Sequence, residues 1–124
     1  MAAEKNFENR VKKFLDDEGC WCVKFFANAY TKAGIPDLLV CCHGFFIGVE
    51  LKAPKGKPSP LQLWNREQII KAGGFSVILY PDDFCAFKEM ILCLKQCQTI
   101  EAAMCADKIN ERTVMKDANV PQPG

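Results

Sequence analysis

Asp37, Glu50 and Lys52 are the residues whose types and spacing could do chemistry in this chain. They flank two apolar runs that are separated by His43-Gly44, a dipeptide suited to a tight hairpin turn because glycine accepts a positive φ. A hairpin centred on that turn would place Asp37 directly opposite Glu50, with Cβ atoms about 4.5–5.5 Å apart. The sequence therefore predicts two carboxylates that face each other across neighbouring strands.

Facing carboxylates repel each other, so one of these two acids should have a raised pKa unless a cation lies between them. Lys52 would project from the same strand face as Glu50, because side chains alternate along a strand. Two acids and a lysine on one face are typical of a metal site beside a phosphate, which is the outline of a nuclease. The bare pattern also fits an exposed strand face with ordinary surface charges. The alternate residues of the second strand are expected to face the core: Ile47, Val49 and Leu51.

The elements that must position these residues form an α/β arrangement, a mixed central sheet flanked by helices in the order α-β-β-β-α-β-α. A crossover of this length between strands is normally helical. We expect one domain over residues 1–112 and a flexible tail over 113–124. The predicted elements are a helix over 4–18, a strand from Trp21 to Phe26, the hairpin strands, a helix from Pro60 to Gly73, a strand from Phe75 to Tyr80, a helix from a cap at Asp82 or Asp83 to about Gln98, and a weak helix over 100–111.

Two of the predicted helices carry polar residues that could reach the hairpin. Glu8 lies about 100° around the first helix from Phe7, at the margin of the apolar stripe, where an acid can reach into a site. A solvent-exposed glutamate fits that position too. Ser59 and Gln62 form an S-x-x-Q capping box at the start of the next helix, so Gln62 has a structural role whether or not it also serves a site.

Composition limits the possible functions. The chain has 124 residues, of which 49% are hydrophobic and 25% charged, with a net charge of +1. That balance is typical of a globular protein and not of a strongly basic DNA binder. Lys52, Lys55 and Lys57 nevertheless form a compact basic strip, which also fits a solvated loop. No apolar run of membrane-spanning length and no signal peptide are evident, so we expect a cytoplasmic protein without membrane contact.

Eight cysteines occur without any C-x-x-C pair, and His43 is the single histidine. Structural zinc sites usually show short paired spacings, so zinc is not expected. Free cysteine is among the most buried residue types. We therefore favour reduced core thiols over a disulfide framework.

Several segments, taken in order, resemble the virus-type replication-repair nuclease (VRR-NUC) domain of the PD-(D/E)xK nuclease superfamily. They are G-I-P-D-L-L-V, V-E-L-K-A-P-K-G-K-P-S-P-L-Q and A-G-G. The resemblance is closest to small stand-alone phage and bacterial members, extends from about Glu4 to Glu89 and is most specific over residues 33–74. It implies a restriction-endonuclease-like core. The segment that gives the family its name falls near Val77-Ile78-Leu79, which carries no arginine here, so any role of those arginines is in doubt.

The resemblance also implies roles for individual residues. Asp37 and Glu50 match the two carboxylates that bind Mg²⁺ or Mn²⁺, with the Leu51 backbone carbonyl as a further ligand and Glu8 helping to hold or orient the metal. Lys52 matches the lysine that positions the attacking water or stabilises charge on the phosphate. The catalytic set implied by the resemblance is Glu8, Asp37, Glu50, Lys52 and Gln62.

The implied activity is that of a metal-dependent, structure-selective DNA endonuclease, a homodimer that cuts branched DNA such as four-way junctions in the manner of a Holliday-junction resolvase. Tyr30, Lys32, Lys55 and Lys57 are candidate DNA contacts. The helix over 84–94 is a candidate dimer surface, although core packing is favoured for it. Two alternatives stay open: a nuclease of the same chemistry that acts on flaps, ends or nicks, and a non-catalytic nucleic-acid-binding module.

Overall fold

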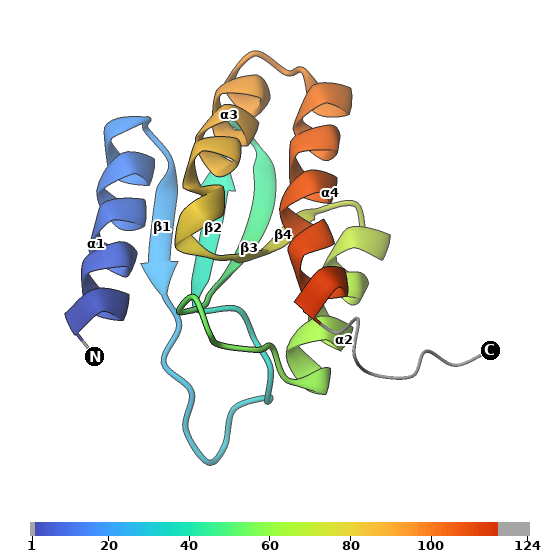
Figure 1. The fold of residues 1–124 in the computed structure, drawn as a ribbon. Coiled ribbons are helices and arrows are strands. Elements are labelled where there is room, and N and C mark those ends of the chain that lie inside the picture. The colour runs from blue at the N-terminus through green and yellow to red at the C-terminus, as the bar shows by residue number, and fades with distance from the viewer. Residues whose placement is uncertain (1, 117–124) are drawn as a thin grey trace.

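The computed structural model describes the backbone of residues 2–116 and the side chains of residues 5–115. Four strands form one sheet in the order β1-β2-β3-β4 (Figure 1). Within the described residues, no helix is long and apolar enough to cross a membrane. The elements are α1 (Ala2–Asp17), β1 (Trp21–Lys24), β2 (Leu38–Cys42), β3 (Phe45–Leu51), α2 (Pro60–Lys71), β4 (Phe75–Leu79), a 3₁₀ turn η1 (Pro81–Asp83), α3 (Phe84–Lys95) and α4 (Thr99–Lys116).

The β2–β3 hairpin has the predicted register. Cys42 pairs with Phe45 and Leu38 with Val49 in antiparallel order. His43 and Gly44 both have positive φ, 50° and 90°, as a two-residue hairpin turn requires. Because β1 is antiparallel to β2 and β4 is parallel to β3, the sheet is mixed, as expected.

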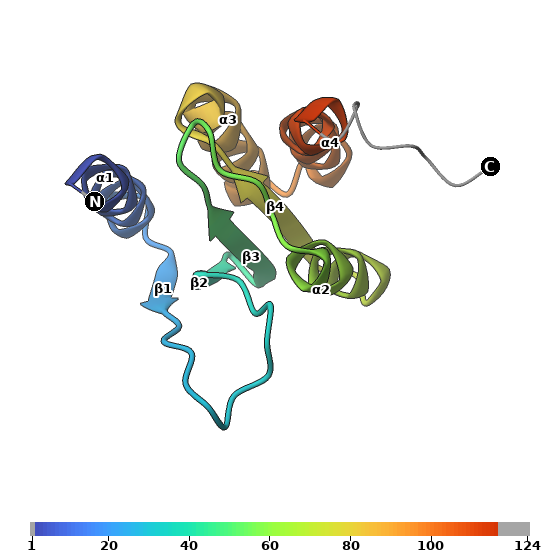
Figure 2. The ribbon, with the colours of Figure 1, turned by 60° about the horizontal axis from the view of Figure 1, so that its bottom comes forward.

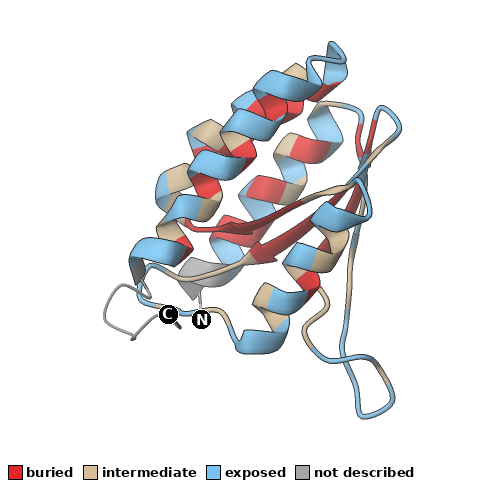
Figure 3. Cartoon of the chain, turned by 90° about the vertical axis from the view of Figure 1, so that its right-hand side faces the viewer, coloured by how far each residue is buried: buried red, intermediate tan, exposed pale blue. Residues whose placement is uncertain are grey.

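Three helices, α1, α3 and α4, cover one face of the sheet, and α2 covers the other face beside β3 and β4 (Figure 2). The apolar stripe of α1 is buried as predicted, with Val11 and Leu15 fully inaccessible. In α3 the stripe that includes Phe87 and Leu94 is also fully buried, so core packing accounts for it. Figure 3 shows the buried residues along the sheet and on the inward sides of the helices.

The boundaries of α3 differ from the prediction. The helix begins after η1 and ends at Lys95, three residues before the predicted end at Gln98. Asp83 occupies the N-cap position, but its side chain makes no capping hydrogen bond. Its carboxylate instead accepts hydrogen bonds from the Arg112 guanidinium, with an Nη2–Oδ1 distance of 3.0 Å. The predicted N-cap position is therefore confirmed, but the side chain does not cap the helix because an arginine on α4 engages the same carboxylate.

Helix α4, predicted as a weak helix over 100–111, is longer than predicted. It includes residues 113–116, which the sequence analysis assigned to the tail, and Thr113 is 1% exposed. The remainder of that tail, residues 117–124, lies outside the described residues. Helix α4 packs against α3 and β4, and it therefore forms part of the core.

Asn110 of α4 ties this helix to the outer edge of the sheet. Its Oδ1 accepts a hydrogen bond from the backbone N–H of Ile78 (3.2 Å), and its Nδ2 donates to the carbonyl of Ser76 (2.9 Å). The amide thus gives hydrogen-bond partners to two backbone groups on the outer edge of β4, where no further strand of the described residues pairs. Arg66 of α2 donates to the same Oδ1 at 3.2 Å.

The cysteines are less buried than expected. All eight are free thiols, but only Cys20 and Cys42 are buried; Cys41, Cys85 and Cys97 are exposed and the other three are intermediate. The expectation of core thiols therefore holds for two of the eight positions. Strand alternation explains part of the difference, because Cys41 and Cys42 lie on opposite faces of β2.

We expect Asn110→Ala to lower the free energy of unfolding by about 1–3 kcal/mol, because it leaves the two backbone groups of β4 without their partner. Urea denaturation measures this change. Asn9→Ala is the matched control, since Asn9 is exposed on α1 and its loss should have little effect. Equal stability of the two variants would contradict the role of Asn110 at the sheet edge.

Candidate active site

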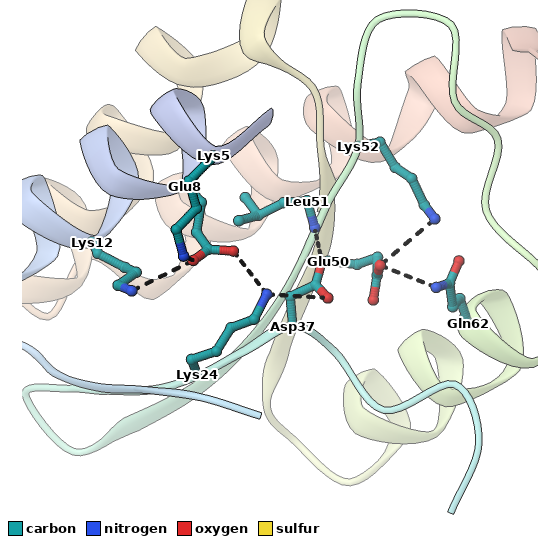
Figure 4. Close-up of polar contacts among 9 residues, drawn as sticks. All are labelled: Lys5, Glu8, Lys12, Lys24, Asp37, Glu50, Leu51, Lys52 and Gln62. Carbon is teal, nitrogen blue, oxygen red and sulfur yellow. Dashed lines mark hydrogen bonds and ion pairs between the residues drawn. The ribbon is translucent and has the colours of Figure 1, made fainter. Parts of the chain in front are cut away.

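A pocket of about 650 Å³ lies where α1, the ends of the strands and the loop after β3 meet. Its lining combines acids and bases contributed by widely separated parts of the chain. The ionisable residues that line it are Lys5, Glu8, Arg10, Lys24, Asp37, Glu50 and Lys52. Figure 4 shows how most of these side chains converge. The pocket therefore brings together the hairpin residues and the Glu8 of α1.

Asp37 is held at the entrance to β2 by backbone contacts. Its own carbonyl accepts a hydrogen bond from the Phe25 N–H (2.8 Å), and its Oδ2 accepts one from the Leu51 N–H (2.9 Å). The second contact fixes the carboxylate beside the end of β3, next to Glu50 (Figure 4). The hairpin register thus brings the two predicted carboxylates together.

Glu50 is buried, with only 6% of the residue exposed. Its Oε2 accepts a hydrogen bond from Gln62 Nε2 (3.0 Å) and lies 3.6 Å from Lys52 Nζ, whereas its Oε1 is buried without a hydrogen-bond partner. Burial and, to a lesser extent, the charge of Asp37 raise the pKa of Glu50 to about 8, against the opposing effect of Lys52. A raised pKa was expected for one of the pair, but burial is its largest cause.

Gln62 serves both the helix and the site. Its backbone N–H donates to Ser59 Oγ (3.1 Å) and its side-chain Oε1 accepts from the Ser59 N–H (2.9 Å), which completes the predicted capping box of α2. The Nε2 of the same amide is then directed to Glu50. The helix cap thereby fixes the orientation of the buried carboxylate.

Gly34 and Asn65 hold the loop before Asp37 against α2. Gly34 has a φ of 81°, and a Cβ at this position would lie 2.7 Å from the backbone of Leu61. Only glycine allows this close approach. Asn65 Nδ2 donates to the Ala33 carbonyl (3.1 Å) across the same contact. The glycine of the G-I-P-D segment therefore has a packing role, which positions the aspartate three residues later.

Glu8 also reaches the pocket, and three lysines surround it. Its Oε1 accepts a hydrogen bond from Lys24 (2.7 Å), and its Oε2 lies 3.2 Å from Lys5 and 3.5 Å from Lys12. Burial opposes ionisation of Glu8, but the contacts with Lys24 and Lys5 outweigh it and lower the pKa to about 2. The carboxylate is therefore a stable anion at neutral pH.

Lys24 is the site residue that the sequence analysis missed. Its ammonium lies 2.7 Å from Glu8 Oε1 and 3.8 Å from Asp37 Oδ1, so it links α1 to the hairpin acids (Figure 4). Lys24 pairs with Leu38, the neighbour of Asp37. That register could have located the lysine, but the turn residues of the loop over 25–37, such as Asn28 and Gly34, do not by themselves fix how β1 pairs with β2.

The four predicted DNA-contacting residues lie outside the pocket lining. Tyr30 is 98% exposed, and Lys32 Nζ lies 5.3 Å from the centroid of the Trp64 ring. Lys55 and Lys57 are exposed in the loop after β3, which is anchored by a hydrogen bond from the Tyr80 hydroxyl to the Gly56 carbonyl (2.7 Å). The structure thus leaves these side chains on the surface around the carboxylates without bringing them into contact with the acids.

The described residues contain no cluster of three or more histidine, cysteine, aspartate or glutamate side chains that could hold a metal ion. Asp37 and Glu50 are two carboxylates, and Mg²⁺ is commonly bound by one or two of them together with water and substrate oxygens. Glu50 Oε1, buried and unpartnered, is the kind of oxygen that a hard cation would satisfy. The donor set therefore fits Mg²⁺ or Mn²⁺.

The fold is similar to that of a solved structure titled "VRR_NUC domain". The TM-score is 0.51 with 29% sequence identity, and the match covers 59% of this chain and 78% of the other. No family model and no curated protein matches the chain. The structural match confirms the resemblance indicated by the sequence motifs: the chain has a VRR-NUC-like, restriction-endonuclease-like α/β fold.

In the absence of metal, we expect the free energy of unfolding to fall as pH rises from about 5 to about 8. Folded Glu50 retains its proton up to a pKa of about 8, whereas the unfolded side chain releases it near 4.5, so the folded state binds more protons in this window. Glu50→Gln should remove this decline, which amounts to at most about 1.4 kcal/mol per pH unit. Denaturation of both proteins in EDTA at several pH values measures it.

Glu111→Gln, an exposed position on α4, is the control and should follow the wild-type pH dependence. If Glu50→Gln shows the same decline as wild type, the buried carboxyl is not its source.

Proposed function

We propose that this nuclease-type domain is a metal-dependent DNA endonuclease that hydrolyses phosphodiester bonds in branched DNA, in the manner of a Holliday-junction resolvase. The observation that carries the proposal is the pairing of Asp37 with the buried Glu50, which has an unpartnered oxygen and the Lys52 ammonium 3.6 Å from its carboxylate. The VRR-NUC-like fold supports the same activity. The preference for branched DNA and a homodimeric state follow from the family resemblance alone.

The chemistry can be assigned to individual residues. Asp37, Glu50 and the Leu51 carbonyl would hold the metal ion, which when bound activates water and offsets charge on the phosphate. Lys52 places a point positive charge beside Glu50, where it can bind a phosphate oxygen and orient the water. Gln62 holds the Glu50 carboxylate in one orientation through its 3.0 Å hydrogen bond. Preorganisation of this kind avoids reorganisation during the reaction.

The surroundings suit a polyanionic substrate. Lys5, Arg10 and Lys24 line the pocket beside the acids, and Lys55 and Lys57 are exposed on the loop at its rim. Contacts between such residues and phosphates position a nucleic acid without reading its sequence. Selection by DNA shape, with a strong dependence on salt, is the expected consequence.

A homodimer would suit a substrate with two equivalent strands to cut, because a two-fold axis presents two identical sites. A nuclease of the same chemistry that acts on flaps, ends or nicks is the alternative within this class. A non-catalytic binding module is the alternative outside it. The buried Glu50 argues against a non-catalytic binding module. A carboxyl group buried beside another acid destabilises the fold unless a cation binds there, and a module without a metal site would have no such cation.

Cleavage of an end-labelled four-way junction, beside the matching linear duplex, tests the proposal. We expect paired symmetric cuts in the junction with Mg²⁺ or Mn²⁺ and none with EDTA, because the two carboxylates need a cation to act. Asp37→Asn and Glu50→Gln should abolish cleavage, and Lys52→Ala should lower turnover by at least about 100-fold, in the range of a lost transition-state contact, while DNA binding is retained.

Cleavage of both substrates would retain the nuclease and remove the junction preference. Absence of cleavage by folded protein with every metal would favour the binding module. Normal turnover of Lys52→Ala would contradict the role assigned to that lysine.

Gln62→Ala should lower both stability and cleavage, because it removes one half of the capping box, the Oε1 contact with the Ser59 N–H, together with the Glu50 contact. Ser59→Ala is the matched control: it removes the other half, the Oγ contact with the Gln62 N–H, at about 1 kcal/mol, but leaves the Glu50 contact in place. Thermal unfolding and single-turnover cleavage are compared for the two variants. If they lose cleavage equally, the contact between Gln62 and Glu50 has no part in the reaction.

A further inference from the structure

Lys24 lies where a second metal ion would need to bind. In two-metal sites the two ions lie about 3.5–4 Å apart. If Asp37 and Glu50 held one ion, a second would need the remaining acid of the pocket, Glu8, and would lie between Asp37 and Glu8. The Lys24 ammonium occupies this place, 2.7 Å from Glu8 Oε1 and 3.8 Å from Asp37 Oδ1 (Figure 4).

Glu8 has no free oxygen to offer a metal. Its Oε1 is engaged by Lys24 and its Oε2 by Lys5 at 3.2 Å and Lys12 at 3.5 Å. The Glu8 side chain is only 10% exposed and that of Lys24 only 24%, so neither group can turn fully into solvent without breaking packed contacts. A divalent ion would bind carboxylate oxygens at about 2.0–2.1 Å and would meet strong repulsion from the ammonium.

We propose that the Lys24 ammonium fills the second cation position of this site, so that the chain holds a single divalent ion on Asp37 and Glu50, with Glu8 acting as the anchor of the lysine. The inference rests on the proposed function and specifies its metal stoichiometry. Lys24 is a positioning residue in this account, because it acts on Asp37 and does not itself hold the metal.

The arrangement gives the carboxylate pair an ammonium on each side. Lys52 lies 3.6 Å from Glu50, and Lys24 lies 3.8 Å from Asp37. A fixed lysine supplies part of the positive charge that a second ion would bring, and it does so at any metal concentration. The family resemblance implies that Glu8 helps to hold or orient the metal; in this proposal it does so only indirectly, through Lys24.

Electron paramagnetic resonance of the full chain titrated with Mn²⁺, without DNA, tests the proposal. Wild type should bind one Mn²⁺ and give the spectrum of an isolated ion. Lys24→Met, which keeps the length of the side chain and removes the charge, should bind two and give the multiline spectrum of an exchange-coupled pair. Isothermal titration calorimetry gives the stoichiometry independently.

Two controls isolate the charge between Glu8 and Asp37. Lys24→Arg retains a cation there and should stay at one Mn²⁺. Lys12→Met removes a lysine that contacts Glu8 and has no ion pair with Asp37, and it should also stay at one.

The wild-type spectrum is informative even if Lys24→Met fails to fold. A coupled pair in wild type would overturn the single-ion proposal and leave the proposed nuclease intact. A folded Lys24→Met that binds one ion would show that Lys24 does not exclude the second. No bound Mn²⁺ in wild type would overturn the proposed metal-dependent function together with this inference.

Discussion

The site depends on the close approach of two carboxyl groups, one of which, that of Glu50, is buried. The two-residue turn at His43-Gly44 sets the β2–β3 register, and that register places Asp37 beside Glu50. Like charges at this separation repel each other, and burial adds to the cost of ionising Glu50. Neighbouring contacts offset part of this cost. Asp37 accepts a hydrogen bond from the Leu51 N–H and lies near the Lys24 ammonium. Glu50 accepts a hydrogen bond from Gln62 and lies near the Lys52 ammonium. The metal-free fold therefore favours the protonated form of Glu50, and a bound cation would favour its ionised form.

The proximity of the two carboxyl groups is maintained by parts of the structure far from them. Strand β3 is fixed on one side by β2 and on the other by β4, whose Leu79 carbonyl accepts the Lys52 N–H at 3.0 Å. Strand β4 is in turn secured at its outer edge by Asn110 of α4. The position of Lys52 thus depends on the last helix in the chain. A site built on paired strands inside a packed core is held more rigidly than one built on loops.

Local signals in the sequence were sufficient for the hairpin and the capping box. Both motifs depend on residues close in sequence. The turn residues set the strand register that brings Asp37 beside Glu50, and the S-x-x-Q pattern places Gln62 at the start of α2. Lys24 could not be located in this way, because a 13-residue loop separates β1 from β2 and its register with β2 is decided by tertiary packing. The same reason applies to Asp83, whose competing partner Arg112 lies 29 residues away. Predictions failed where a distant residue determined the local conformation.

The low net charge of the chain is a weaker argument against a nucleic-acid substrate than the sequence analysis suggested. A net charge of +1 is an average over the molecule, whereas a phosphate responds to the field at the site. Four cationic side chains line the pocket beside three acidic ones, and a pKa of about 8 leaves most Glu50 side chains protonated at neutral pH before a metal binds. The pocket is thus locally positive in a nearly neutral protein. A bound cation would displace the proton from Glu50 and add its own positive charge to the site. The pocket therefore attracts a phosphate both with and without the metal.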